Sequence, residues 1–115
     1  MFTIPFFDLI EAAIKKGASE LRLIVGRRPA IRLRGRLQAL DAGVLKPGDT
    51  LALMKSLTPG RGRQELREAG SCDYGFAFST PDRSFRARFR VAVSRKKGNL
   101  GIVLRRIPYQ HHANP

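Results

Sequence analysis

The chain has 115 residues, of which 43% are hydrophobic, and it carries a formal net charge of +13 at pH 7. This length suffices for one domain with its own core, and no apolar run reaches the roughly 20 residues of a membrane-spanning helix. Cys72 is the only cysteine, so an intramolecular disulfide is excluded; we interpret it as a small buried side chain just before a strand. With no signal-peptide pattern at its start, we expect a soluble, cytoplasmic protein.

The first predicted element is an amphipathic helix over residues 5–16. Its apolar side chains recur at spacings of three and four, which is the spacing of one helix face. Lys15 and Lys16 lie where cations stabilise the negative end of the helix dipole, and Gly17 tolerates the positive φ that commonly ends a helix. The next residues alternate in polarity, which predicts a strand over residues 20–25 and a turn over residues 26–29.

Arginine then occupies every second position in two separate stretches. These are Arg32, Arg34 and Arg36, and later Arg86, Arg88 and Arg90, with apolar residues between most of them. A period of two is typical of a strand with one buried and one exposed face, so we predict an arginine row on the face away from the core in each stretch. Gly35 interrupts the first row and indicates a bulge or a tight turn, so residues 20–40 hold two or three short strands.

The middle of the chain predicts two helices, the first after Pro47 and the second with Thr58 as its N-cap and Gly70 at its end. A strand around residues 74–78, a turn over residues 79–82, the second arginine strand over residues 84–93, a basic loop over residues 95–101 and a last strand over residues 102–107 follow. These elements predict an α+β domain over residues 1–108, with an antiparallel sheet of about five to six strands and helices packed on one face. Residues 109–115 have no apolar pattern and indicate the start of an interdomain linker or a disordered tail.

Residue patterns typical of catalysis are missing from the sequence. His111 and His112 are the only histidines, and they are adjacent, whereas metal ligands on a helix require a spacing of three or four residues. No Gly-Lys dipeptide exists, so there is no P-loop, and the fragment at residues 60–62 lacks the third glycine of a dinucleotide fingerprint. We therefore expect this chain alone to be no enzyme and to bind no metal.

The positive charge instead predicts an anionic partner. No Asp or Glu follows Asp82, and a surplus of like charges does not favour compact folding. Nucleic acid, nucleotide phosphates, anionic lipid head groups and an acidic face of another domain all provide the opposite charge. Composition alone leaves these four alternatives open.

Five segments in order along the chain carry a resemblance to a known family. They are Gly-Ala-Ser-Glu-Leu-Arg-Leu at residues 17–23, Gly-Arg-Arg-Pro-Ala-Ile-Arg-Leu-Arg-Gly-Arg-Leu at 26–37, Asp-Tyr-Gly-Phe at 73–76 with Arg-Phe-Arg-Val at 88–91, and Leu-Arg-Arg-Ile-Pro at 104–108. This set resembles the N-terminal domain of the PilT-like twitching-motility motors, which are type IV pilus retraction ATPases of the type II/IV secretion ATPase superfamily. The resemblance covers roughly residues 7–108.

The resemblance implies a PAS-like N-terminal domain that precedes a RecA-like ATPase domain in a hexameric motor. In such motors this domain is not catalytic, packs on the ATPase domain of the neighbouring subunit and supplies arginines to the nucleotide. The matching positions imply Arg90 and Arg105 as nucleotide contacts. ATP and Mg would be the cofactors of the full-length motor, with none in this chain. Pilus or secretion machinery at the cytoplasmic face of the inner membrane would be the larger partner.

The subunit interface is expected to include exposed arginines of the two rows. They are Arg32, Arg34, Arg36 and Arg88. Four positions depart from the family pattern: Glu20 replaces an Asp, Arg22 a His, Arg34 a commonly acidic residue and Ala92 an Asn. Glu20 and Arg22 thus replace the acid–histidine pair of the family. In isolation we expect the domain to be monomeric or weakly self-associating.

A stand-alone nucleic-acid-binding module is the main alternative. Basic strands can follow a phosphate backbone, with an affinity that falls steeply as salt rises. Phe85 and Phe89, however, alternate with the arginines and should point into the core, so they cannot stack on bases bound to the arginine face. Docking on anionic lipid through residues 95–97 is a third alternative, but no amphipathic anchor supports it.

Overall fold

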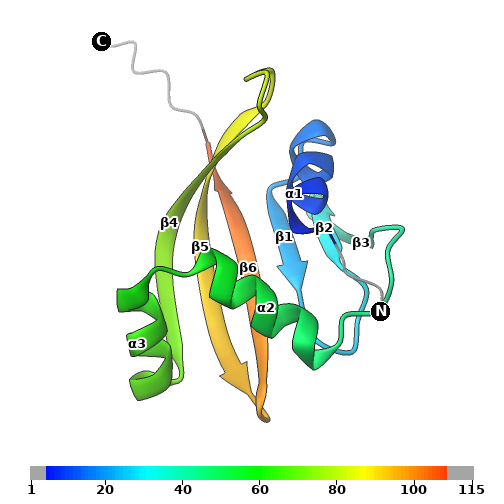
Figure 1. Ribbon diagram of the computed structural model, residues 1–115. Helices are drawn as coiled ribbons and strands as arrows, with labels where there is room; N and C mark the ends of the chain where they lie inside the picture. Colours follow the sequence, from blue (N-terminus) through cyan, green and yellow to red (C-terminus); the bar gives the residue numbers. More distant parts are fainter. Residues whose placement is uncertain (1–4, 109–115) are drawn as a thin grey trace.

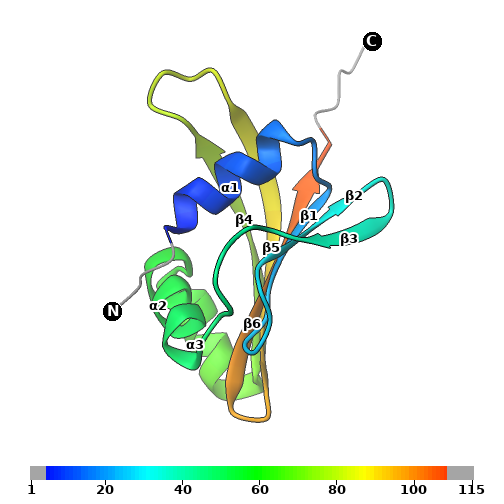
Figure 2. The same cartoon turned by 90° about the vertical axis from the view of Figure 1, so that its right-hand side faces the viewer.

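The computed structural model describes residues 5–108 and shows three helices on one face of a six-stranded antiparallel sheet (Figures 1 and 2). The helices are α1 (Phe6–Lys15), α2 (Pro47–Leu57) and α3 (Gly60–Ala69). The strands are β1 (Glu20–Leu23), β2 (Ala30–Leu33), β3 (Arg36–Ala39), β4 (Ser71–Ser79), β5 (Arg86–Lys96) and β6 (Asn99–Ile107). The predicted α+β class, the number of strands and the single helical layer are confirmed.

The spatial order of the strands is β3-β2-β1-β6-β5-β4. Two meanders, β1 to β3 and β4 to β6, therefore meet where β1 pairs with the last strand, β6. Because β3 and β4 lie at opposite edges, the chain must cross the sheet between them, and α2 and α3 make that crossing (Figure 1). The face opposite the helices, called the outer face below, bears no helix among the described residues.

The second arginine stretch has the predicted alternation. In β5 the odd-numbered residues Ala87, Phe89, Val91 and Val93 are buried, and the even-numbered Arg86, Arg88 and Arg90 are exposed. The apolar face of α1, with Ile10 fully buried, belongs to the same core. The helices thus cover one side of the sheet and leave the arginine row of β5 on the outer face.

The single arginine row predicted for the first stretch is wrong, whereas the tight turn predicted at Gly35 is confirmed, because this stretch is a hairpin. β2 ends at Leu33, β3 begins at Arg36, and both turn residues have positive φ, 51° at Arg34 and 80° at Gly35. These angles are typical of a type I′ turn. Arg36 is opposite Leu33, and Arg32 is opposite Leu37, so Arg32 and Arg36 lie on opposite faces of the sheet.

Three smaller predictions are corrected in the same way. The basic loop is only a tight turn, since β5 continues to Lys96 and β6 begins at Asn99. Thr58 is the C-cap of α2 and does not cap α3, whose N-cap is Pro59. The Thr58 hydroxyl is instead 2.9 Å from the Tyr74 hydroxyl. Cys72 lies within β4, where burial is the main cause that raises the pKa of its thiol.

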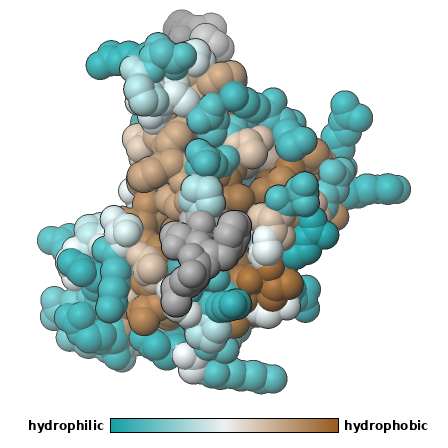
Figure 3. All heavy atoms as spheres, turned by 45° about the vertical axis from the view of Figure 1, so that its right-hand side comes forward, coloured by the Kyte–Doolittle hydropathy of each residue, from teal (hydrophilic) through white to brown (hydrophobic). Residues whose placement is uncertain are grey.

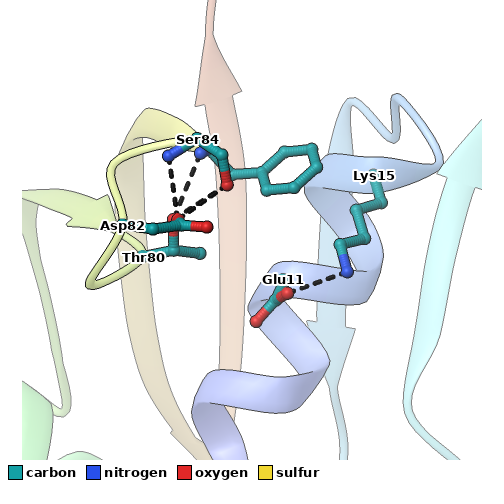
Figure 4. A network of polar contacts seen from close by, with 6 residues as sticks. Glu11, Lys15, Thr80, Asp82 and Ser84 are labelled. Atoms are coloured by element: carbon teal, nitrogen blue, oxygen red, sulfur yellow. Dashed lines mark hydrogen bonds and ion pairs between the residues drawn. The ribbon is translucent and has the colours of Figure 1, made fainter.

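The turn between β4 and β5 packs beside α1. The Asp82 carboxylate accepts hydrogen bonds from the Ser84 backbone N–H (3.0 Å) and from the hydroxyls of Thr80 and Ser84 (2.7 Å each). These bonds lower the pKa of Asp82 to about 2, and the bond from the Ser84 backbone N–H makes the largest contribution. Figure 4 shows this turn beside the ion pair of Glu11 and Lys15 on α1, and the Lys15 Nζ lies 5.2 Å from the centroid of the Phe85 ring.

Candidate functional site

The outer face of the sheet gathers most of the basic strand residues. Strand pairing places on it the following basic residues: Arg22, Arg32, Arg86, Arg88, Arg90, Lys96 and Arg105. Glu20 and Asp73 are the acidic residues of the described strands on this face. Because like charges on neighbouring strands repel, the two carboxylates decide which arginines are neutralised.

One row of residues crosses the outer face at right angles to the strands. Arg32 of β2 is opposite Glu20 of β1, Glu20 is opposite Arg105 of β6, Arg105 is opposite Arg90 of β5, and Arg90 is opposite Gly75 of β4. Directly opposed residues have their Cβ atoms about 5 Å apart. The two arginines predicted to contact nucleotide, Arg90 and Arg105, are therefore immediate neighbours.

Glu20 is the centre of an ion-pair cluster on this row. Its carboxylate lies 3.4 Å from Arg22 Nε, 3.5 Å from Arg105 Nε and 3.9 Å from Arg32 Nε. The Glu20 side chain is only 10% exposed, whereas that of Arg105 is 74% exposed. Glu20 thus contacts Arg105 through its Nε edge and leaves most of the guanidinium open to solvent. Glu20 and Arg22, which replace the acid and the histidine of the family pattern, contact each other as an ion pair.

Arg90 has a different counter-ion. Its Nη2 donates a hydrogen bond of 2.9 Å to Oδ1 of Asp73, and both side chains are more than half exposed, at 58% and 59%. Asp73 is opposite Ala92 and not opposite Arg90, so the contact is diagonal across β4 and β5.

The remaining predicted interface arginines separate into two groups. Arg88 is on the outer face, one pair along from Arg90, where Ile107 and Ala77 are opposite it. Arg32 is tied by a hydrogen bond from its Nη1 to the Gly35 carbonyl (3.1 Å). Arg34 lies in the turn and Arg36 on the other face, so the structure does not bring these two to the row.

Sequence reasoning missed the two carboxylates as site residues. Glu20 and Asp73 lie in the segments that carry the resemblance, but only strand pairing shows which arginines they contact. The structure also separates Arg105 from its sequence neighbour Arg106. Arg106 is opposite Phe89, so it points to the helix-bearing side, and Arg105 alone faces Arg90.

The helix-bearing side has an apolar groove between α1, α2 and β4. The residues that line it include Phe6, Phe7, Leu53, Leu57 and Phe76. Phe7 is 60% exposed, and its ring stacks on that of Phe78 at 5.8 Å. Figure 3 shows apolar side chains gathered in the middle of this side, with hydrophilic side chains around them.

Neither a metal cluster nor a membrane helix is found in the described part of the chain. Residues 5–108 contain no group of three or more His, Cys, Asp or Glu side chains that is placed to hold a metal ion. None of the helices in this range is both long and apolar enough to span a bilayer. His111 and His112 and the predicted linker lie outside the described residues.

Comparison with known proteins gives relatives of one kind, although no family model matches the chain. The chain is 28% identical to the type IV pilus ATPase PilU of Pseudomonas aeruginosa over 104 residues, which are 90% of this chain and 26% of PilU. It is 31% identical to the type IV pilus retraction ATPase PilT of the same organism over 101 residues, which are 88% of this chain and 28% of PilT. The chain thus spans little more than a quarter of these relatives.

Solved structures agree with the sequence relatives. The pilus retraction motor PilT with bound ADP superimposes with a TM-score of 0.79 and 33% identity, over 96% of this chain and 30% of that one. The ATPase DotB of Legionella pneumophila gives a TM-score of 0.75 and 27% identity, over 93% of this chain and 30% of DotB. The chain is therefore homologous to the PilT and PilU pilus ATPases, and it has the fold of the N-terminal domain of PilT.

Proposed function

We propose that this chain is the non-catalytic N-terminal domain of a pilus retraction or secretion motor ATPase, in which Arg90 and Arg105 contact the bound nucleotide. The observation that carries the proposal is the placement of these two arginines as direct neighbours on an outer face that no described helix covers. The homology to PilT and PilU supports the assignment to such a motor.

The chemistry of the arginine pair fits a polyphosphate. Each guanidinium is planar, permanently charged, and offers parallel N–H donors that match phosphate oxygens. Two of them on opposed residues repel each other, and an anion between them would remove that repulsion. The carboxylates nearby are already paired with arginines, so the described residues offer phosphate donors but no magnesium site. ATP and Mg would be held by a RecA-like ATPase domain.

Contacts in the proposed motor follow from the same face. Arg90 and Arg105 would approach the nucleotide of their own subunit, and Arg88 with Arg32 would face ATPase domains of the ring, including that of the neighbouring subunit. Arg34 and Arg36 remain interface candidates at the β2–β3 edge, away from the nucleotide. This domain and the RecA-like ATPase domain would close around ATP and separate after its hydrolysis. This cycle would power a hexameric motor at the cytoplasmic face of the inner membrane.

The test is a chimera in which this chain replaces the N-terminal domain of Pseudomonas aeruginosa PilT. Loss of one charge-assisted hydrogen bond costs about 1.5–3 kcal/mol, so we expect Arg90→Ala and Arg105→Ala each to lower kcat/KM for ATP by about tenfold or more. Arg106→Ala is the matched control, because it changes an adjacent arginine on the opposite face. An ATP turnover equal to that of the control would contradict the assignment.

Nucleic-acid binding remains the alternative function, and the basic outer face is the observation in its favour. Gly75, Ala77 and Ala92 on that face are small residues, and the arginines of β5 beside them are exposed. The aromatic residues Phe76 and Phe89 pair across the strands on the helix-bearing side, where they cannot stack on bases. Tight binding of generic DNA by the isolated chain at physiological salt would favour this alternative over the motor.

A further inference from the structure

We propose that Asp73 is an internal competitor of the nucleotide phosphates for Arg90. In the absence of an anion its carboxylate holds the Arg90 guanidinium, and a polyphosphate bound next to Arg105 displaces it. The inference rests on the proposed function, since it describes how the same arginine pair is regulated.

The first observation is the contrast between the two carboxylates of the outer face. Glu20 is nearly buried, contacts three arginines and holds Arg105 by its Nε edge. Asp73 is more than half exposed and, within residues 5–108, its side chain contacts Arg90 alone, through one hydrogen bond of 2.9 Å. An exposed pair with a single contact is weak, because water and salt screen both charges. Arg105 thus has a nearly buried counter-ion, whereas the counter-ion of Arg90 is exposed and can be released.

The second observation is the open space beside Arg90. Its directly opposed residue is Gly75, and a Cβ atom built on Gly75 would have no heavy atom of the described residues within 4 Å outside its chain neighbours. Asp73 lies diagonally to one side of Arg90, and Arg105 lies opposite it in β6. No side chain of β4 therefore blocks a rotation of the guanidinium from Asp73 towards an anion at Arg105.

The competing ligands differ in charge and in number of acceptors. A carboxylate carries one negative charge, whereas a terminal phosphate carries up to two and has three acceptor oxygens for the donors of both arginines. After the exchange Asp73 is left unpaired, but its side chain is already largely hydrated, so the loss is small. A di- or triphosphate that reaches both arginines is favoured over an anion that reaches only one.

The experiment measures the binding of inorganic tripolyphosphate to the 115-residue chain by calorimetry at low ionic strength. Asp73→Asn removes the competing charge but keeps the shape of the side chain. We expect this variant to bind tripolyphosphate about twofold to fivefold more tightly, because that factor corresponds to the free energy of an exposed ion pair. Asp41→Asn is the matched control. It breaks another exposed contact between an Asp and an Arg, that with Arg28 at 3.8 Å, beyond the opposite edge of the sheet.

Three further results decide between the proposals. Arg90→Ala should weaken the binding of tripolyphosphate. In the double variant Arg90→Ala/Asp73→Asn, the second substitution should increase the affinity by no more than Asp41→Asn does in the wild-type chain. If Asp73→Asn binds no more tightly than that control while Arg90→Ala still weakens binding, the competitor is disproved and the arginine assignment stands. If neither Arg90→Ala nor Arg105→Ala weakens binding, or if no variant binds at millimolar concentrations, both proposals fail for this face.

Discussion

Glu20 and Asp73 both neutralise arginines on the outer face, but their burial makes their contributions to stability unequal. A nearly buried carboxylate with three guanidinium partners cannot be replaced by water, and its loss leaves Arg22, Arg32 and Arg105 to repel one another. Because these arginines are partly exposed, hydration will offset some of that loss. The effect should therefore be smaller than the 3–5 kcal/mol typical of a fully buried pair.

We expect Glu20→Gln to lower the free energy of unfolding by about 1–2 kcal/mol. Asp73→Asn should lower it by about 0.4–1 kcal/mol, because that ion pair is exposed. Urea denaturation of the two variants and the wild type measures both changes. Equal changes in the free energy of unfolding would show that the burial of Glu20 does not make its ion pairs stronger than that of Asp73.

Some site residues were predictable from the sequence, and others depended on register. Arg90 was found from the period of two and from the Arg-Phe-Arg-Val motif, both of which are local patterns. The partnership of Glu20 with Arg105 joins the first strand to the last, so no local pattern contains it. Asp73 contacts Arg90 diagonally across β4 and β5. Predicting this contact therefore requires the exact residue-by-residue pairing of the two strands.

At the scale of elements, the predicted strands differ most from the structure at two-residue turns. A type I′ turn places its flanking residues opposite each other on the same face, so a period of two that continues through the turn changes face. This is why Arg32 and Arg36 lie on opposite faces although they are four positions apart. The turn at Lys97 and Gly98 has the same positive φ angles, 52° and 82°. Asn-Gly or Asp-Gly would have signalled these turns, but here Arg and Lys stand in the first position.

Helices were predicted more accurately, since their signals lie within one segment. The apolar spacing of α1, Pro47 at the start of α2 and Gly70 after α3 all agree with the structure. The N-cap of α3 was wrong for a tertiary reason. The Thr58 hydroxyl is used by Tyr74 of β4, and this contact also explains why α3 approaches β4 closely at Gly62.

Two glycines in the first turns of α2 and α3 give a prediction at this scale. A Cβ on Gly48 would meet no atom of residues 5–108 within 4 Å, whereas a Cβ on Gly62 would lie 2.8 Å from the Thr58 Cγ2. Ala is the better helix former, so we expect Gly48→Ala to raise the free energy of unfolding by about 0.5 kcal/mol. Gly62→Ala should lower it by about 1 kcal/mol, because Thr58 must move and weaken its bond to Tyr74. Thermal unfolding followed by circular dichroism compares the two variants, and a stabilised Gly62→Ala would contradict the close packing of α3.

For the whole molecule, the net charge of +13 makes self-repulsion the general electrostatic term. Added salt screens this repulsion, so the unfolding temperature should rise with sodium chloride. That response would be found for any strongly basic protein and says nothing about a site. A polyanion that binds the native outer face adds a second term, since a ligand that binds only the folded state stabilises it by mass action.

We therefore expect tripolyphosphate to raise Tm more than sodium chloride does at equal ionic strength. At about ten times its dissociation constant the ligand adds about 1.4 kcal/mol, which corresponds to about 5–8 °C for a domain of this size. The double variant Arg90→Ala/Arg105→Ala should keep its response to chloride and lose the additional rise, whereas a double variant of Arg61 and Arg63 on α3, with the same charge, should keep both. Differential scanning calorimetry of the three proteins measures these shifts. If the additional rise follows net charge and not position, polyanions bind the basic surface diffusely, and Arg90 and Arg105 do not form a site.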